Sequence, residues 1–244
     1  DRSLLRVQLR DMWMFVGTGI ISVTLFSYCY FTTVINVEAG IAASLLYTSP
    51  VFVMLFSAVL FRERITAQKI AAIVLTVSGV ALVSGMLGSS ALGALDLIIG
   101  IGAGLFYSLY SIFGVYALRK YSSLTVTFYP FLLGTIGFLF MTNPIAIIEK
   151  TASNPVVIPM EIGLALFNGL LPYLFYTIGL GHTDASVAGV LVAVEPLVGC
   201  LVGIFVFHES VNPAKLIGIA LILSAIVLLN IRLSHKSTAK EIPA

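Results

Sequence analysis

One carboxylate lies deep inside an otherwise uncharged stretch of the sequence. Glu195 interrupts an apolar run over 185–208, and Pro196 follows it directly. An ionisable side chain at membrane depth is costly and marks a functional site by default. Desolvation favours a bound proton on such a carboxyl group, whereas a cationic group of a ligand stabilises its ionised form. Glu195 is therefore a candidate proton- or cation-binding residue. The structural alternative is a protonated side chain hydrogen-bonded to a neighbouring helix.

Two prolines sit at equivalent places in two apolar stretches. Pro196 has no backbone N–H and frees carbonyl groups about one turn earlier, and Pro50 does the same in the other stretch. Unwound carbonyls near the membrane midplane suit a solute site. Ser49 precedes Pro50 as Glu195 precedes Pro196, so the two stretches differ in charge at this point.

Tyrosines recur at the depth of these prolines. Tyr107 and Tyr110 are three residues apart and share a helix face, while Asn168, Pro172 and Tyr176 recur every four residues as one stripe. Tyrosine offers a flat apolar ring with a polar tip, which suits a neutral or zwitterionic organic solute. For each single tyrosine, packing or an interfacial belt is the alternative. The candidate solute-binding residues are Tyr30, Tyr47, Ser49, Tyr107, Tyr110, Asn168, Tyr176 and Glu195.

The sequence offers little for catalysis or metal binding. His182, His208 and His235 all fall in expected loops, and Cys29 and Cys200 lack metal-ligand spacing. An intramembrane enzyme needs its nucleophile and base together at depth. We therefore expect no enzymatic activity, no catalytic residues, no cofactor and no metal.

Composition restricts the class of protein. Of 244 residues, 13 are Lys or Arg and 11 are Asp or Glu; charged residues make up 10% and hydrophobic residues 59%. Soluble domains average roughly 25% charged residues. These values exclude a soluble globule, a disordered chain, a disulfide-stapled module and a nucleic-acid binder with a basic face. The remaining class is an all-α polytopic membrane protein with the lipid bilayer as its outer solvent.

The positions of the charges predict eight transmembrane helices, because a span needs about 20 apolar residues. Most links between them are short, and 143–159 is expected to be a loop that rests on the membrane surface. The predicted spans are 12–35, 39–60, 67–87, 97–118, 124–142, 160–180, 185–207 and 214–232.

The basic residues predict the orientation. In the eight-span arrangement, eleven of the 13 Lys and Arg residues fall on one side and only Lys150 and Lys215 on the other. Cytoplasmic loops retain Lys and Arg, so both ends of this chain are expected in the cytoplasm. The eleven are Arg2, Arg6, Arg10, Arg62, Arg64, Lys69, Arg119, Lys120, Arg232, Lys236 and Lys240.

The chain contains a repeat at an offset of 146 residues, which carries the first three predicted helices onto the last three. Pro50 falls on Pro196, Phe61-Arg62-Glu63 on Phe207-His208-Glu209, and Lys69 on Lys215. The basic turn at 62–69 is expected inside, yet its counterpart falls outside, so the repeat is inverted. Inverted repeats are the architecture of many secondary transporters, with the solute bound between the halves.

The stretch from Ala43 through Tyr47-Thr48-Ser49-Pro50 to Phe61-Arg62-Glu63-Arg64 resembles the repeat signature of the EamA-type drug/metabolite transporter superfamily. Ala193-Val194-Glu195-Pro196 running to Phe207-His208-Glu209 resembles it as well. The resemblance implies ten helices in two inverted repeats of five. Here 1–90 would be the first repeat with three helices, 91–235 the second with five, and 236–244 a cytoplasmic tail. We therefore expect a fragment truncated at its amino end rather than a genuine eight-helix protein.

The resemblance also implies a function. We expect a secondary transporter in a bacterial plasma membrane that moves a small organic solute, such as an amino acid or related metabolite, or exports drugs, by alternating access. The expected spans lack Lys and Arg, which ranks anionic solutes low. The alternatives are a membrane scaffold subunit that does not transport and, further behind, an intramembrane enzyme. Proton coupling, the direction of transport and a homodimer remain open.

Cysteine labelling tests the orientation. In a chain without Cys29 and Cys200, single cysteines at 63, 121 and 238 should react with an impermeant maleimide from the cytoplasmic side. Cysteines at 90, 152 and 211 should react only from outside, because each of these lies after an odd number of predicted spans. Labelling of position 211 from the cytoplasm would contradict the inverted repeat.

Overall fold

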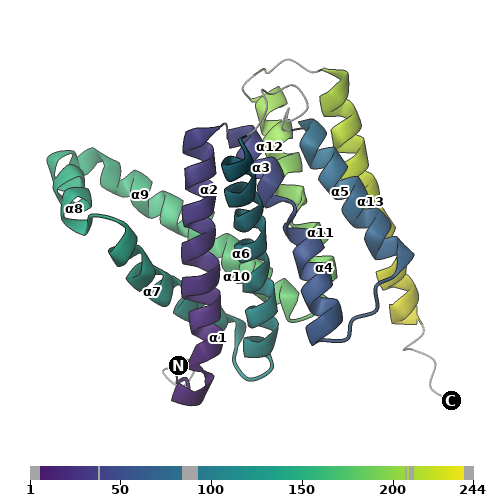
Figure 1. Ribbon diagram of the computed structural model, residues 1–244, viewed down its shortest axis with the longest axis horizontal. Helices are drawn as coiled ribbons and strands as arrows, with labels where there is room; N and C mark the ends of the chain where they lie inside the picture. Colours follow the sequence, from purple (N-terminus) through teal and green to yellow (C-terminus); the bar gives the residue numbers. More distant parts are fainter. Residues whose placement is uncertain (1–5, 38, 84–92, 207, 209–211, 239–244) are drawn as a thin grey trace. The chain divides into compact units, whose positions relative to one another are not determined.

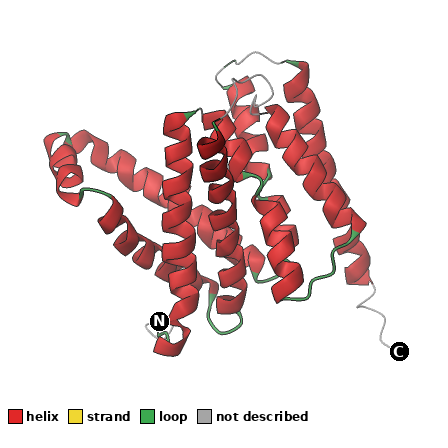
Figure 2. Cartoon of the chain, viewed as in Figure 1, coloured by secondary structure: helices red, strands yellow, loops and turns green. Residues whose placement is uncertain are grey.

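The computed structural model describes residues 6–37, 39–83, 93–206, 208 and 212–238, without the side chains of 229–238. All regular structure within these ranges is helical (Figures 1 and 2). Helices satisfy their own backbone hydrogen bonds, which lipid requires. The predicted all-α class is therefore confirmed.

Within the described ranges, six helical segments are long and apolar enough to cross a membrane. Two further helices, α5 (Ala67–Val83) and α13 (Pro213–Thr238), are apolar over shorter stretches, α13 as far as Leu228. These eight segments correspond to the eight predicted spans, although 84–87 and 207 lie outside the described residues. Eight spans and a ten-helix whole remain predictions.

Several spans consist of more than one helical piece. The first runs from the 3-10 turn η2 (Leu9–Asp11) through α1 (Met12–Val16) and the π-helical segment η3 (Gly17–Thr24) to α2 (Leu25–Asn36). The second span contains α3 (Ala39–Leu46) and α4 (Ser49–Leu60). By contrast, α6 (Ala94–Leu118) and α7 (Ser123–Met141) are each one continuous helix. The sixth predicted span corresponds to η5 (Pro155–Val157), α9 (Ile158–Leu164), η6 (Ala165–Leu170) and α10 (Leu171–Leu180). The seventh corresponds to α11 (Ala185–Leu191) and α12 (Val194–Phe205).

The expected loop at 143–159 is a short helix instead. Residues Pro144–Ser153 form α8, whose amino end is capped by Asn143: its Oδ1 atom accepts a hydrogen bond from the Ala146 N–H at 3.2 Å. Proline at the first helical position and asparagine just before it favour a helix start, which explains the difference from the expected loop.

Side-chain caps also start two other helices. Thr66 Oγ1 accepts a hydrogen bond from the Lys69 N–H at 3.3 Å, which starts α5. Asn212 Oδ1 accepts one from the Lys215 N–H at 2.8 Å, with Pro213 as the first residue of α13. These contacts satisfy donors that a helix start leaves open.

The chain divides into two compact units, each with its own packing. The first comprises the residues up to Ser27 and Leu109–Thr183; in it α1 and η3 pack against α7, and Met14, Phe15, Ala117 and Val126 form a buried cluster. The second comprises Tyr28–Ser108 and the residues from Asp184 onward, and its largest contact joins α5 to α13.

Three irregularities of the backbone recur at the offset of 146 residues. The π-helical segments η3 and η6 overlap when shifted by this offset. The breaks between α3 and α4 and between α11 and α12 coincide within one residue. Arg62 and His208 have positive φ angles of 56° and 54°. Hydrophobic composition alone does not explain matched irregularities, so these features support the predicted repeat.

The α5–α13 contact has a glycine on each helix at its closest point. A Cβ on Gly79 would lie 2.8 Å from the carbonyl oxygen of Gly218, and a Cβ on Gly218 would lie 2.7 Å from that of Gly79. Small residues let helices in lipid approach closely and gain van der Waals contact.

Gly79→Val should therefore lower stability in detergent. The added side chain must push the two backbones apart, and overpacking of this kind costs about 1–3 kcal/mol. Gly179→Val is the matched control, because a Cβ there has no atom within 4 Å. The melting temperature should fall clearly for the first variant and little for the second. Equal melting temperatures would show that the helices can separate without loss.

Candidate functional site

Glu195 lies where a membrane-spanning segment is broken. It is the second residue of α12, directly after the break from α11, and its side chain is exposed rather than packed in the core. The hydroxyl group of Tyr47, in the equivalent break between α3 and α4, hydrogen-bonds to the Glu195 carboxylate, and Tyr30 interacts with it electrostatically. The structure thus brings together three of the predicted site residues within the second unit.

The two breaks keep most of their backbone groups bonded. Thr48 donates both its N–H and its hydroxyl group to the Leu45 carbonyl, at 3.2 and 2.6 Å. In the other break, the Glu195 N–H donates to the Val192 carbonyl at 2.9 Å. Pro196 cannot supply that donor, so the N–H of Glu195 takes its place in a tighter turn. The Val192 carbonyl is therefore bonded, contrary to the expectation that it is free for a solute.

Glu195 lies in the first turn of α12, beside the amino terminus of that helix. A helix amino terminus carries partial positive charge, which stabilises an acidic side chain in the first turn. Tyr47 is 5% exposed and adds a neutral donor to one side of the carboxylate. The exposed remainder can accept hydrogen bonds from an ammonium group or take up a proton.

For the other two predicted site residues of this unit, the structure gives burial and position on a helix. Ser49 is buried at the start of α4, and Tyr107 is half-buried on α6. Both remain candidates for solute contact.

Three predicted residues lie in the first unit and form a different arrangement. The hydroxyl groups of Tyr110 and Thr177 are 2.8 Å apart, and those of Ser111 and Tyr176 are 2.7 Å apart. These pairs fasten α6 to α10 and satisfy polar groups that would be costly in lipid. For Tyr110 and Tyr176 this geometry favours the packing interpretation. Asn168 is exposed on η6.

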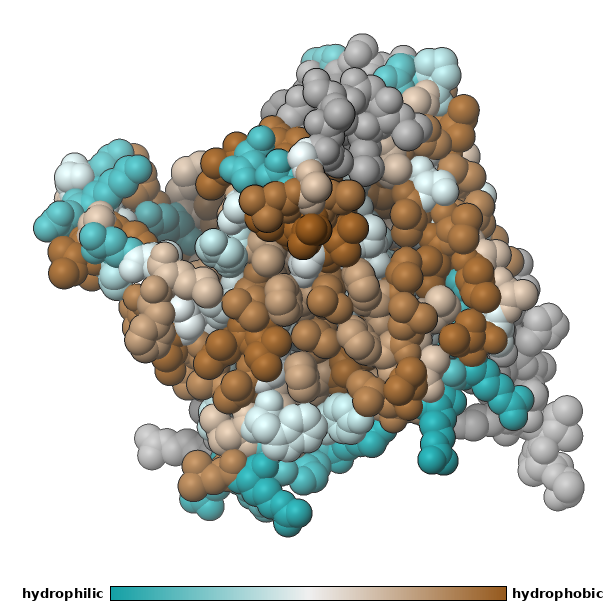
Figure 3. Space-filling view, in the orientation of Figure 1, coloured by the Kyte–Doolittle hydropathy of each residue, from teal (hydrophilic) through white to brown (hydrophobic). Residues whose placement is uncertain are grey.

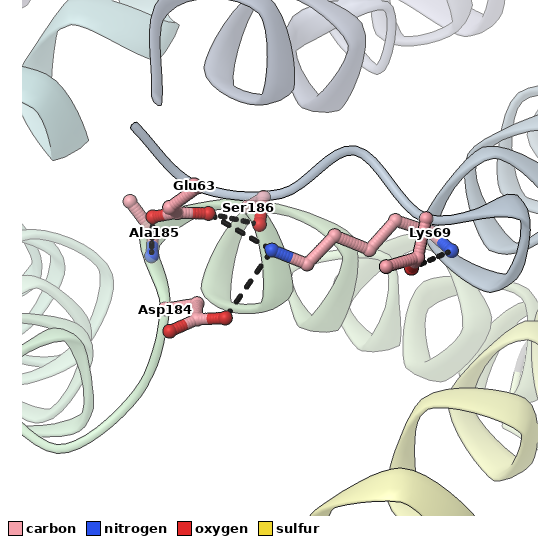
Figure 4. A network of polar contacts seen from close by, with 6 residues as sticks. Glu63, Lys69, Asp184, Ala185 and Ser186 are labelled. Atoms are coloured by element: carbon pink, nitrogen blue, oxygen red, sulfur yellow. Dashed lines mark hydrogen bonds and ion pairs between the residues drawn. The ribbon is translucent and has the colours of Figure 1, made fainter. Parts of the chain in front are cut away.

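A buried lysine forms the centre of a polar network in the second unit (Figure 4). Lys69, whose side chain is 7% exposed, places Nζ 3.0 Å from Glu63 Oε2 and 3.2 Å from Asp184 Oδ2. Glu63 also accepts hydrogen bonds from the Ala185 N–H at 3.2 Å and the Ser186 hydroxyl group at 2.5 Å. We call Glu63, Lys69, Asp184, Ala185 and Ser186 the Lys69 network.

The Lys69 network differs from what the sequence predicts for its members. Glu63 pairs with Lys69 in the first turn of α5 and also caps the amino end of α11. Lys69 was expected only to set orientation, yet it is buried between two carboxylates. No local sequence pattern predicts these contacts, because Asp184 and Ser186 are more than 110 residues from their partners in the sequence. Glu38 and Glu209 lie outside the described residues.

A second network joins the start of the chain to the turn between α6 and α7. Asp11 is 3% exposed, and its carboxylate accepts hydrogen bonds from Lys120 Nζ and from the Tyr121 hydroxyl group, both at 2.7 Å. The Tyr121 oxygen in turn accepts one from the Gln8 N–H at 3.2 Å. Partial burial, aided by the nearby carboxylate, raises the pKa of the Tyr121 phenol, so it remains a neutral donor.

The middle of the face drawn in Figure 3 is mostly apolar. Large hydrophobic side chains on most helices are exposed, among them Phe31, Val59, Phe140 and Phe205. A water-soluble protein rarely exposes so much apolar area. Among the residues that the structure describes, no group of three potential metal ligands converges. The chain is therefore an integral membrane protein built from broken helices, with a carboxylate at one break.

Comparison with known proteins gives the family. The model of the EamA-like transporter family matches residues 2–85 and again 95–231, so the chain belongs to this family. This confirms the resemblance found in the sequence and identifies a membrane transport protein.

Individual relatives agree with this assignment. An uncharacterized transporter of Archaeoglobus fulgidus is 30% identical over 82% of this chain and 70% of its own length. A probable terminal-alkyne amino-acid exporter of Streptantibioticus cattleyicolor is 27% identical over 93% and 76%. The threonine/homoserine exporter RhtA of Escherichia coli K12 is 24% identical over 88% and 70%. One solved structure, titled only as a crystal structure of a protein, has a TM-score of 0.73 at 19% identity and covers 95% of this chain and 78% of its own, which supports the fold.

Proposed function

We propose that this protein is a secondary transporter that moves a small solute bearing an amino group, such as an amino acid, by alternating access. The observation that carries the proposal is the exposed Glu195 carboxylate at a helix break, hydrogen-bonded to Tyr47. Two relatives with amino-acid exporter names support the class of solute.

The chemistry of the break fits an ammonium group. A carboxylate in low-dielectric surroundings binds a cation more strongly than in water, and it is costly when it has none. Tyr47 adds a ring beside the carboxylate that can contact an organic side chain or, through its face, a cation. A proton can replace the ammonium group at the same oxygen, which would couple solute release to protonation.

The matched irregularities at the offset of 146 residues support alternating access. Two repeats with the same breaks can exchange conformations, so that each takes the shape of the other. Breaks in a span are places where its two halves can tilt separately. The pairs α3–α4 and α11–α12 would supply this movement.

Packing around the Lys69 network supports a state closed at one end. The halves α4 and α11, on the side of the network, pack together: a Cβ on Gly189 would lie 3.4 Å from Val53. The opposite halves make other contacts, α3 with α5 and α12 with α5 and α13. The basic turn at 62–69 is predicted to be cytoplasmic. We therefore infer that the Lys69 network holds the cytoplasmic end closed, and that opening requires its ion pairs to separate.

The carboxylate is tested by Glu195→Gln in proteoliposomes, against amino acids beginning with threonine and homoserine. Glutamine keeps the shape but removes the charge, and hydrogen bonds to charged groups contribute about 1.5–3 kcal/mol, so transport should fall by about 10- to 100-fold. Glu149→Gln, at an exposed site on α8, should transport normally. Wild-type rates for Glu195→Gln at every pH would contradict the proposed role.

The closed end is tested by Lys69→Met, which keeps the length of the side chain and leaves two carboxylates without their cation. Removing one partner of a buried ion pair costs about 3–5 kcal/mol, so the closed state should be less populated. A cysteine at Val53, which is 1% exposed, reports on it. In a chain without native cysteines, its labelling from the cytoplasmic side should be about 10-fold faster or more.

Two further variants complete this experiment. Ser186→Ala removes one hydrogen bond of the network and should shift labelling in the same direction by less. Lys150→Met, at an exposed position, should not shift it. Unchanged labelling in folded Lys69→Met would show that the network is a static anchor.

A further inference from the structure

A basic cleft lies at the amino-terminal end of the first unit. Two adjoining hollows of about 450 Å³ each are bounded by residues 6–14 on one side and by the end of α6 with its following turn on the other. Their charged lining residues are Arg6, Arg10, Asp11, Arg119 and Lys120. We call this region the Arg10–Arg119 cleft.

The floor of the cleft is fixed by the buried Asp11. Its carboxylate is hydrogen-bonded to Lys120 and Tyr121, and Tyr121 accepts the Gln8 N–H. These contacts hold the segment that carries Arg6 and Arg10 against the turn that carries Arg119. Basic residues more than 100 positions apart in the sequence are thus fixed around one hollow.

The charge of the cleft is positive toward solvent. Asp11 is 3% exposed and is engaged by Lys120, whereas Arg6, Arg10 and Arg119 are exposed. The Arg119 guanidinium lies 5.2 Å from the centre of the Tyr116 ring, which orients it beside the aromatic surface. Planar guanidinium groups bind phosphate oxygens in pairs and are weakly hydrated, so they suit a phosphate ligand.

Apolar and aromatic surface adjoins these cations. Trp13 is 50% exposed and packs edge-on against Phe113 and Tyr116, with ring centres 6.1 and 5.6 Å away. Leu9, next to Arg10, is 90% exposed. Tryptophan and tyrosine gather where hydrocarbon meets headgroups. In Figure 3 hydrophilic atoms gather where α1 begins, directly below the hydrophobic surface.

We propose that the Arg10–Arg119 cleft binds the headgroup of an anionic phospholipid. Arg6, Arg10 and Arg119 contact the phosphate, and the acyl chains lie along the apolar surface beyond Trp13. The adjoining apolar surface favours a lipid over a free phosphate ion, which needs no such surface. A headgroup that carries its own ammonium group would meet three cations and bind less well. Basic pockets on the cytoplasmic side of membrane helices bind anionic headgroups in this way.

This proposal is independent of the transported solute. A lipid held between residues 6–14 and the turn after α6 would stabilise both of these segments, and neither segment carries Glu195. Its binding should weaken with salt, because the cations are exposed and screening shortens their reach.

The test measures melting temperature in nanodiscs of phosphatidylcholine with and without phosphatidylglycerol. A ligand that binds only the folded state raises stability with its concentration, and phosphatidylglycerol should raise the melting temperature by about 5 °C. Arg10→Ala/Arg119→Ala should lose most of this rise. Arg62→Ala/Arg64→Ala removes the same charge from the other basic turn and should keep it. Native mass spectrometry should show phosphatidylglycerol bound to the wild type and to the second variant.

Three outcomes would overturn the proposal. Equal melting temperatures with and without phosphatidylglycerol would show that no anionic lipid binds. The same rise with inorganic phosphate alone would show a site for a small anion. Equal loss in both double variants would show a general effect of charge rather than a built site. Melting temperatures in pure phosphatidylcholine show that the variants are folded.

Discussion

The absence of water in the hydrocarbon layer constrains every part of this chain, because each backbone group must find its partner within the protein. Continuous helices such as α6 meet this demand without help. The breaks after Leu46 and Leu191 meet it with tighter turns and with the Thr48 hydroxyl group. Broken helices at membrane depth persist only where the surroundings compensate for them. The breaks are therefore the strongest candidates for a functional site, and the exposed Glu195 carboxylate lies at one of them.

The same scarcity of water gives the few charged contacts unusual weight. Lys69 and Asp11 are both almost fully buried, and each holds together segments more than 100 residues apart. A buried ion pair adds little net stability, because desolvation offsets the attraction between its charges. Removing one partner nevertheless lowers stability strongly, because the other charge is then buried without compensation. The stability of the fold therefore depends strongly on the presence of both partners in each pair.

Much of this architecture could be predicted from the residues. Charge-free windows located the helical segments and the prolines located both breaks, because each of these effects is local. The Lys69 network could not be predicted, since Glu63 and Ser186 meet only after the chain has folded. The hydroxyl pairs of Tyr110 and Tyr176 were missed for the same reason: helical spacing shows which residues share a face but not what that face contacts. The prediction of a loop at 143–159 was wrong because Asn143-Pro144 was interpreted as a turn, whereas asparagine followed by proline also forms a helix-start signal.

The close contact between α5 and α13 has an internal symmetry. A shift of 146 residues carries Ala72 onto Gly218 and Gly79 onto Ala225. Gly79 meets Gly218, and Ala72 and Ala225 share one buried cluster, so the contact maps onto itself when the repeats are exchanged. A surface that pairs with its own copy is the mark of an isologous interface in a two-fold symmetric dimer. The contact between α5 and α13 therefore has the form of a dimer interface within one polypeptide. A larger side chain at Gly79 would meet Gly218, the equivalent of Ala72 in the other repeat, across the contact.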